Sequence, residues 1–231
     1  MAADARTLAF LHELERADET VGAVLAELDE LAAEVERIQA RVGELRSFLA
    51  DLPDECERVA EALTAGVRAV ADQRQAVDHG KRELEAAERA KGRDRLAAAR
   101  RDLVRVRDAL HTAERKAAEL QERREELERC GAEAEAEASR VEVRAQELAA
   151  VLAERPRLAG DAGVEPGPGL AGVAEWSSRA RAALFVARGG LVAERDAVVR
   201  QANELGALVL GEPLSAASPG AVARRVEQAS S

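Results

Sequence analysis

Apolar residues recur with a sevenfold spacing through the first fifty residues of the chain. Two sets of positions, three or four residues apart, are apolar at nearly every repeat. This spacing predicts one long helix that buries a narrow seam against other helices, as in a coiled coil. The first set is Thr7, Leu14, Val21, Leu28, Val35, Val42 and Leu49, and the second is Phe10, Ala17, Val24, Leu31, Ile38, Leu45 and Leu52.

Pro53 interrupts this pattern and is followed by a signal for a new helix. Asp54 and Glu57 have the spacing of a capping box, in which two side chains satisfy free backbone amides at a helix start. We therefore expect a helix over residues 5–52, a reversal at Pro53 and a second helix over residues 54–90. The seam of the second helix contains Cys56, Leu63, Val70, Val77 and Leu84, alternating with small or polar residues such as Gly66 and Gly80.

The heptad frame fails in the charged stretch at residues 88–95 and resumes in a new phase at Leu103. One interpretation is a second hairpin tip at Lys91 and Gly92, which would start a helix over residues 94–155 and bring Cys56 and Cys130 to a similar height. In that case the two thiols could form a disulfide. The other interpretation is a frame slip inside one continuous helix over residues 54–154.

Gly and Pro residues separate the last part of the chain from these helices. Residues 156–171 read as a Gly/Pro linker, residues 172–211 as a returning helix, and residues 219–229 as a short helix that starts after Ser218. The returning helix has a wide apolar face. Folded back, it would place Leu184, Leu191, Val198 and Leu205 against Leu148, Val141, Ala134 and Leu127.

The pattern predicts an all-α fold: an elongated antiparallel coiled coil or helical bundle of four long helices plus a short C-terminal helix. Residues 1–155 would form the antiparallel coiled coil, residues 156–171 the linker, and residues 172–231 the returning and terminal helices. Composition agrees, because 34% of residues are charged and only 2% are aromatic. Such a mixture is typical of long helices and cannot fill the thick core of a layered α/β protein.

Reactive side chains do not form a recognisable catalytic, cofactor or metal site. His12, His79 and His111 lack the spacing of metal ligands, and the two cysteines match no zinc pattern. Carboxylates are abundant, but they suit the solvated faces of a coiled coil. We therefore expect a protein that is not an enzyme and that has no catalytic residues, cofactor, metal or small-molecule substrate.

Charge is unevenly distributed along a chain whose net charge is −10. A basic stretch at residues 89–107 is a candidate patch for an anionic partner, either nucleic acid or anionic lipid. The alternative is that it neutralises acidic residues of the first helix, such as Asp4, Glu13, Glu15, Asp18 and Glu19. The candidate patch consists of Arg93, Arg95, Arg100, Arg101, Arg105 and Arg107.

The segment AKGRDRLAAA at residues 90–99 resembles the hairpin-tip stretch of the phage shock protein A family, which is related to the ESCRT-III class. Chain length, the long helix after the tip and the short terminal helices also resemble that family. The resemblance implies a membrane-associated remodelling protein that assembles into polymers. The first helix differs from the family's basic amphipathic membrane anchor, because residues 1–60 contain 15 acidic and 6 basic residues.

Together these patterns predict a structural or scaffolding protein that acts through helix–helix association. Its partner would be a protein: a second copy, in a homodimer or higher assembly, or another coiled coil. A membrane-remodelling protein and a nucleic-acid-associated coiled coil are the alternatives. The composition and the absence of a leader peptide favour a bacterial, cytoplasmic protein. The expected contact residues are Leu103, Val106, Leu110, Leu120, Phe185, Val192 and Val199.

Overall fold

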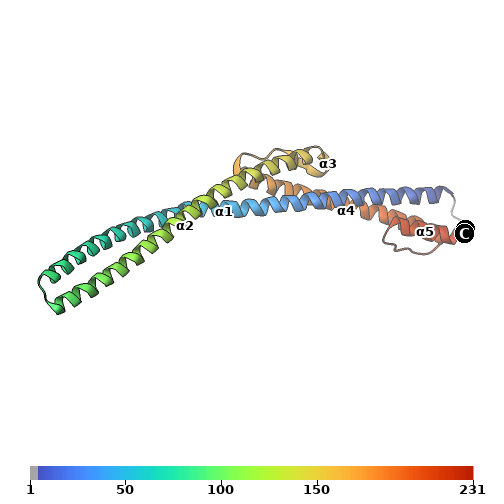
Figure 1. Ribbon diagram of the computed structural model, residues 1–231. Helices are drawn as coiled ribbons and strands as arrows, with labels where there is room; N and C mark the ends of the chain where they lie inside the picture. Colours follow the sequence, from blue (N-terminus) through green and yellow to red (C-terminus); the bar gives the residue numbers. More distant parts are fainter. Residues whose placement is uncertain (1–4, 231) are drawn as a thin grey trace. The chain divides into compact units, whose positions relative to one another are not determined.

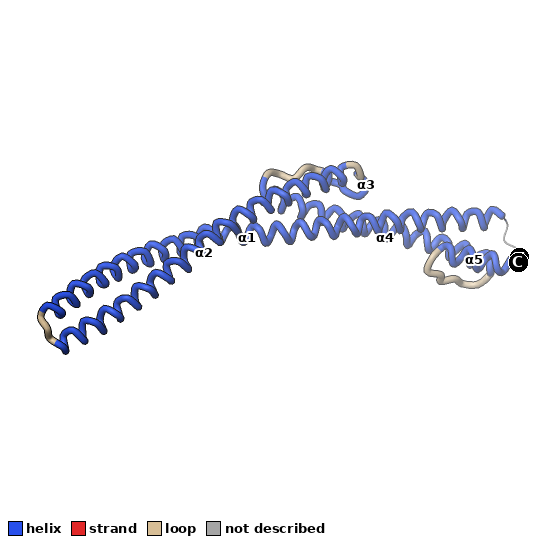
Figure 2. The backbone as a smooth tube through the Cα atoms, in the orientation of Figure 1, coloured by secondary structure: helices blue, strands red, loops and turns tan. Residues whose placement is uncertain are grey.

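A computed structural model describes residues 5–230 of the chain, which form helices joined by short loops (Figures 1 and 2). No strand occurs within this range, so the prediction of an all-α protein is confirmed. The elements are α1 (Ala5–Arg89), α2 (Arg93–Ala153), α3 (Pro156–Ala159), the 3-10 turn η1 (Gly160–Gly163), α4 (Gly169–Leu210) and α5 (Pro219–Ser230).

The reversal expected at Pro53 is wrong, because α1 continues through this residue as one helix of 85 residues. A proline inside a helix removes one backbone hydrogen bond and costs about 3 kcal/mol. Pro53 is exposed, so water can reach the carbonyl group that loses its partner. On either side of it the apolar seam stays covered, since Leu45 and Val59 are both buried. Burial of the seam thus offsets the local loss.

The chain does reverse between α1 and α2, at Ala90, Lys91 and Gly92. Lys91 has a positive φ of 52°, a left-handed conformation that ends a helix. The backbone N–H of Lys91 donates to the carbonyl of Glu88. Residues 54–154 are therefore two helices rather than the continuous helix considered as an alternative.

The chain divides into two compact units, and α1 and α2 each contribute to both. Unit 2, residues 45–137, holds the second half of α1 and the first half of α2. Its contacts keep one register, because each contacting pair lies equally far from Lys91 and Gly92. That distance is 11 residues for Gly80 and Leu103, 25 for Gly66 and Ala117, and 39 for Leu52 and Gly131.

Unit 1, residues 1–44 and 138–231, contains a core built around Trp176. This side chain is fully buried, and its Nε1–H donates to the carbonyl of Ala162 over 3.0 Å. The prediction of a Gly/Pro linker over residues 156–171 is therefore wrong in its first half, where α3 and η1 cover the tryptophan. Leu158 and Ala162 are buried as part of this cover.

α4 runs along the first half of α1, and three arginines at sevenfold spacing bind acidic residues of α1. The order of these ion pairs shows that the two helices run in opposite directions. Leu205 and Val198 pack with α1 and α5, so the expected contacts of these two residues with Leu127 and Ala134 are wrong. The ion pairs are Arg181–Glu36, Arg188–Asp29 and Arg195–Asp18.

α5 docks on the start of α1 and the end of α4. Val222 and Val226 are buried in a cluster with Leu11 and Leu14. The loop before α5 is held by Asn203, whose Nδ2 donates to the carbonyl of Ala216 and whose Oδ1 accepts from the N–H of Ala216. α5 is therefore part of the core of unit 1.

Cys56 and Cys130 are both free thiols and half-buried, so the disulfide considered for them is not formed. In the register of unit 2, Cys56 lies 35 residues before Lys91 and Cys130 lies 38 residues after Gly92. The two side chains therefore belong to different layers of the helix pair.

Replacing Gly172 by alanine should lower the free energy of unfolding. A β-carbon at this position would collide with the backbone of Gly167, which cannot give way like a flexible side chain. We expect a loss of about 1–3 kcal/mol in urea unfolding monitored by Trp176 fluorescence.

Gly43→Ala is the matched control, because a β-carbon at Gly43 would meet no atom within 4 Å. This substitution should raise the free energy of unfolding by up to about 1 kcal/mol, since it adds a better helix former inside α1. Equal effects of the two substitutions would contradict the close approach at Gly172.

Candidate functional site

The first expected contact surface, from Leu103 to Leu120, lies against α1 of the same chain. Leu103 is buried, and its Cδ1 would be 3.2 Å from a β-carbon at Gly80. Leu120 approaches Gly66 in the same way. The prediction of a partner surface is therefore wrong at both ends of this stripe, because the turn at Lys91 folds α1 onto it. Val106 and Leu110 between them are half-buried.

The basic stretch lies at the end of unit 2 and is open to solvent. Residues 81–107 contain 10 basic and 5 acidic residues, whereas the whole chain is acidic. All six arginines of the expected patch are exposed. Among the described residues only one of them has an ion-pair partner, Arg105, whose Nη2 lies 3.3 Å from Asp102.

The expected neutralisation of this patch by the first helix does not occur at Asp18. That carboxylate is buried and binds Arg195 of α4 inside unit 1. Glu15 lies 3.3 Å from His12 in the same unit, and Asp4 lies outside the described residues. The arginines at the turn therefore keep their charge available.

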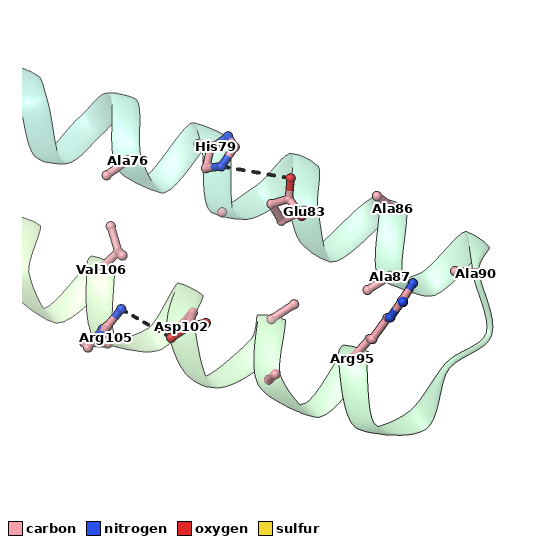
Figure 3. Close-up of a pocket in the computed structure, with 13 residues that line it drawn as sticks. Ala76, His79, Glu83, Ala86, Ala87, Ala90, Arg95, Asp102, Arg105 and Val106 are labelled. Carbon is pink, nitrogen blue, oxygen red and sulfur yellow. Dashed lines mark ion pairs between the residues drawn. The ribbon is translucent and has the colours of Figure 1, made fainter.

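A shallow pocket of about 570 Å³ lies between the two helices next to the turn (Figure 3). Small residues such as Ala87 line it, and Arg95 extends from α2 toward the last turns of α1. His79 pairs with Glu83 on one wall, and Arg105 pairs with Asp102 on the other. These pairs are exposed and lie within single helices, so the pocket has no group of converging side chains of the kind that catalysis requires.

α4 presents one apolar face to its own unit and a second one to solvent. Leu184 is fully buried, but the next two residues are not: Phe185 is 79% exposed and Val186 is 72% exposed. Val192 is 37% exposed and Val199 is half-buried, so all three residues expected on α4 have accessible surface. We call the exposed set the outer face of α4; it comprises Ala182, Phe185, Val186, Gly189, Val192 and Ala193.

The ion pairs with α1 fix which side of α4 is turned outward. Arg188 and Arg195 each hold a carboxylate oxygen of α1 at 2.8 Å. The hydrogen bond from each guanidinium raises its pKa above the usual arginine value, so both remain charged at any physiological pH. α4 cannot rotate its outer face toward α1 without breaking these pairs. Phe185 and Val186 are therefore exposed by a fixed geometry.

Sequence analysis found Phe185 and Val192 but missed Val186, the second most exposed large apolar residue of α4. The signal was present in the spacing of Ala182, Val186, Gly189 and Ala193, which alternates four and three residues. It was overlooked because the heptad of larger residues that starts at Leu184 is stronger and accounts for the buried face.

A further pocket of about 790 Å³ lies in unit 1 among α1, α3 and α4. Glu27 and Arg155 form an ion pair on its wall, and Leu158 and Leu191 contribute apolar surface. The pocket has no nucleophile paired with a base. No group of three or more His, Cys, Asp or Glu side chains in the described range could hold a metal ion.

No helix within residues 5–230 is long and apolar enough to cross a membrane. No family model matches the chain, and neither a curated protein nor a solved structure is significantly similar to it. The outer face of α4 and the basic turn are therefore assessed on their own chemistry.

Exchanging the two neighbours Leu184 and Phe185 for alanine, one at a time, should separate the buried face from the outer face. Leu184→Ala leaves a cavity and should lower the free energy of unfolding by about 2–5 kcal/mol. Phe185→Ala removes an exposed ring and should change it by no more than about 0.5 kcal/mol. Urea unfolding at nanomolar protein, followed by Trp176 fluorescence, measures both effects. A large loss for Phe185→Ala would show that the ring packs within its own chain.

Proposed function

We propose that this protein is a non-enzymatic scaffold that acts through helix–helix association with a protein partner. The observation that supports it is the outer face of α4, where Phe185 and Val186 are exposed directly beside the fully buried Leu184. Contiguous exposed apolar residues of this kind mark protein contact sites. Burying these two side chains in a complex would contribute about 1.5–3 kcal/mol each.

The same proposal describes the helix pairs as antiparallel coiled coils. In unit 2 the contacts at Gly80, Gly66 and Leu52 are spaced by 14 residues, which is two heptads. Small residues lie opposite leucines in these layers, as interdigitating seams require. In unit 1 the arginines that bind α1 are spaced by seven residues. A bacterial cytoplasmic setting, favoured by the composition, is part of this proposal.

Site-specific photo-crosslinking tests the scaffold function directly. A photoreactive phenylalanine analogue in place of Phe185 should capture a protein partner in the cells that produce this chain. The same analogue in place of Val104 is the control, because Val104 is 57% exposed but lies in unit 2 and outside the outer face. Labelling of protein at position 185 alone is the expected result. Absence of any protein adduct at this position, or equal labelling at both, contradicts the proposal.

A second candidate function is the binding of an anionic partner at the basic turn. The observation that favours it is the exposure of all six arginines around Lys91, five of which lack an ion-pair partner among the described residues. The segment that resembles the phage shock protein A family, residues 90–99, contains this turn. An anionic lipid surface would suit a membrane-remodelling protein, and phosphates would suit a nucleic-acid-associated one.

Removing four arginines at the turn should abolish anion binding, if the turn has this function. Binding is measured by flotation with anionic vesicles and by retention of duplex DNA, each at low and at physiological salt. A control variant removes four arginines farther along α2 and should bind like the parent chain. Failure of the parent chain to bind either probe at low salt contradicts the second candidate. The test variant carries Arg93→Gln, Arg95→Gln, Arg100→Gln and Arg101→Gln, and the control carries Arg115→Gln, Arg123→Gln, Arg124→Gln and Arg129→Gln.

A further inference from the structure

We propose that the partner of the outer face is the same face of a second copy, bound antiparallel about a twofold axis between Ala187 and Arg188. In this register Ala182 of one copy lies opposite Ala193 of the other, and Val186 lies opposite Gly189. The inference rests on the proposed scaffold function and specifies its partner and geometry.

The outer face extends into a complete second heptad seam on α4. The buried seam of this helix includes Val173, Ser177, Ala180 and Leu184. Two residues further along from each of its positions runs a parallel series, about 200° around the helix axis and thus on the opposite side. Every residue of this second series is exposed: Glu175, Arg179, Ala182, Val186, Gly189, Ala193, Asp196 and Arg200.

Apolar and small residues occupy the middle of this seam, and opposite charges occupy its ends. Glu175 and Arg179 lie at one end, and Asp196 and Arg200 lie at the other. None of these four side chains forms an ion pair with another described residue. Charged residues at the ends of an apolar strip set which partner and which orientation fit.

The charge order matches itself only when the two helices run in opposite directions. In the proposed register, Arg179 faces Asp196 of the second copy, and Glu175 faces Arg200 of the second copy. The twofold axis repeats both pairs, so four ion pairs flank the apolar centre. A parallel pair in register would instead place each charge opposite its own like. The pattern therefore favours a second copy over an unrelated helix and antiparallel over parallel pairing.

Phe185 and the neighbouring glycines fit the centre of this interface. Phe185 flanks the seam on the same side as Val192, and in an antiparallel pair the same flank of both helices meets. Each Phe185 ring would lie between Phe185 and Val192 of the second copy. A β-carbon at Gly189 or Gly190 would meet no atom within 4 Å, so no contact within the described chain explains glycine at these helix positions. Close approach of a second helix explains both.

Disulfide formation between two different single-cysteine chains tests the register. The parent for both carries Cys56→Ala and Cys130→Ala; one chain adds Ala182→Cys and the other adds Ala193→Cys. A mixture should form a disulfide-linked dimer under mild oxidation, because these positions face each other in the proposed pair. Each chain alone should stay unlinked, since identical positions of an antiparallel pair lie 11 residues apart at each end, about 16 Å by the helix rise and beyond disulfide reach. Linkage of either chain with itself, or none in the mixture, overturns the proposed register.

Charge exchange tests the ion pairs that orient the dimer. Arg179→Glu places two acidic groups together at both ends of the interface, and Asp196→Arg does the same with two basic groups. Each single variant should weaken dimerisation about tenfold in sedimentation equilibrium, and the double variant should restore it by forming the reversed pair. Equal weakening in the double variant and the single ones overturns the assigned pairing.

The outcomes separate this inference from the scaffold function. A chain that stays monomeric in sedimentation, yet gives photo-adducts with a different protein at Phe185, overturns the self-pairing and leaves the scaffold function standing. A chain that gives no protein adduct at Phe185 at all, including with itself, overturns both.

Discussion

The structure depends on keeping a narrow apolar seam covered along the whole length of very long helices. α1 has few large side chains per turn, so no single region of it can supply a thick core. Its stability has to come from a partner helix at every turn. In unit 2 that partner is α2, held in one register from the turn at Lys91 as far as Leu52 and Gly131. In unit 1 the ion pairs with α4 mark a second partner along the first half of the helix.

Sequence analysis predicted the helices well but was weaker on how they pair. The all-α class, the interruption near Lys91 and the short helix after Ser218 follow from local signals that need no knowledge of the fold. Pro53 misled it, because a proline ends a helix only when tertiary packing does not hold both sides, and here Leu45 and Val59 are buried on either side. The heptad of Leu184 and Leu191 shows that α4 packs, but not on which helix.

The two candidate sites differ in how far the sequence could define them. Composition alone locates the basic turn, because a run of arginines is visible without a structure. The outer face of α4 needs the structure, since the sequence shows two apolar columns and cannot tell which is buried. Leu184 at 0% and Phe185 at 79% exposure resolve this. The stripe beginning at Leu103 had an equally good pattern, yet it turned out to be covered by α1.

Asn203 makes the docking of α5 sensitive to a slow chemical change. Its amide accepts one hydrogen bond from the backbone of Ala216 and donates to two carbonyl groups, those of Ala216 and Val199. Hydrolysis of the amide to a carboxylate would leave an acceptor facing both carbonyl oxygens, so two attractions would become repulsions. Ageing of this one side chain would therefore loosen residues 211–218 before it disturbed the core around Trp176.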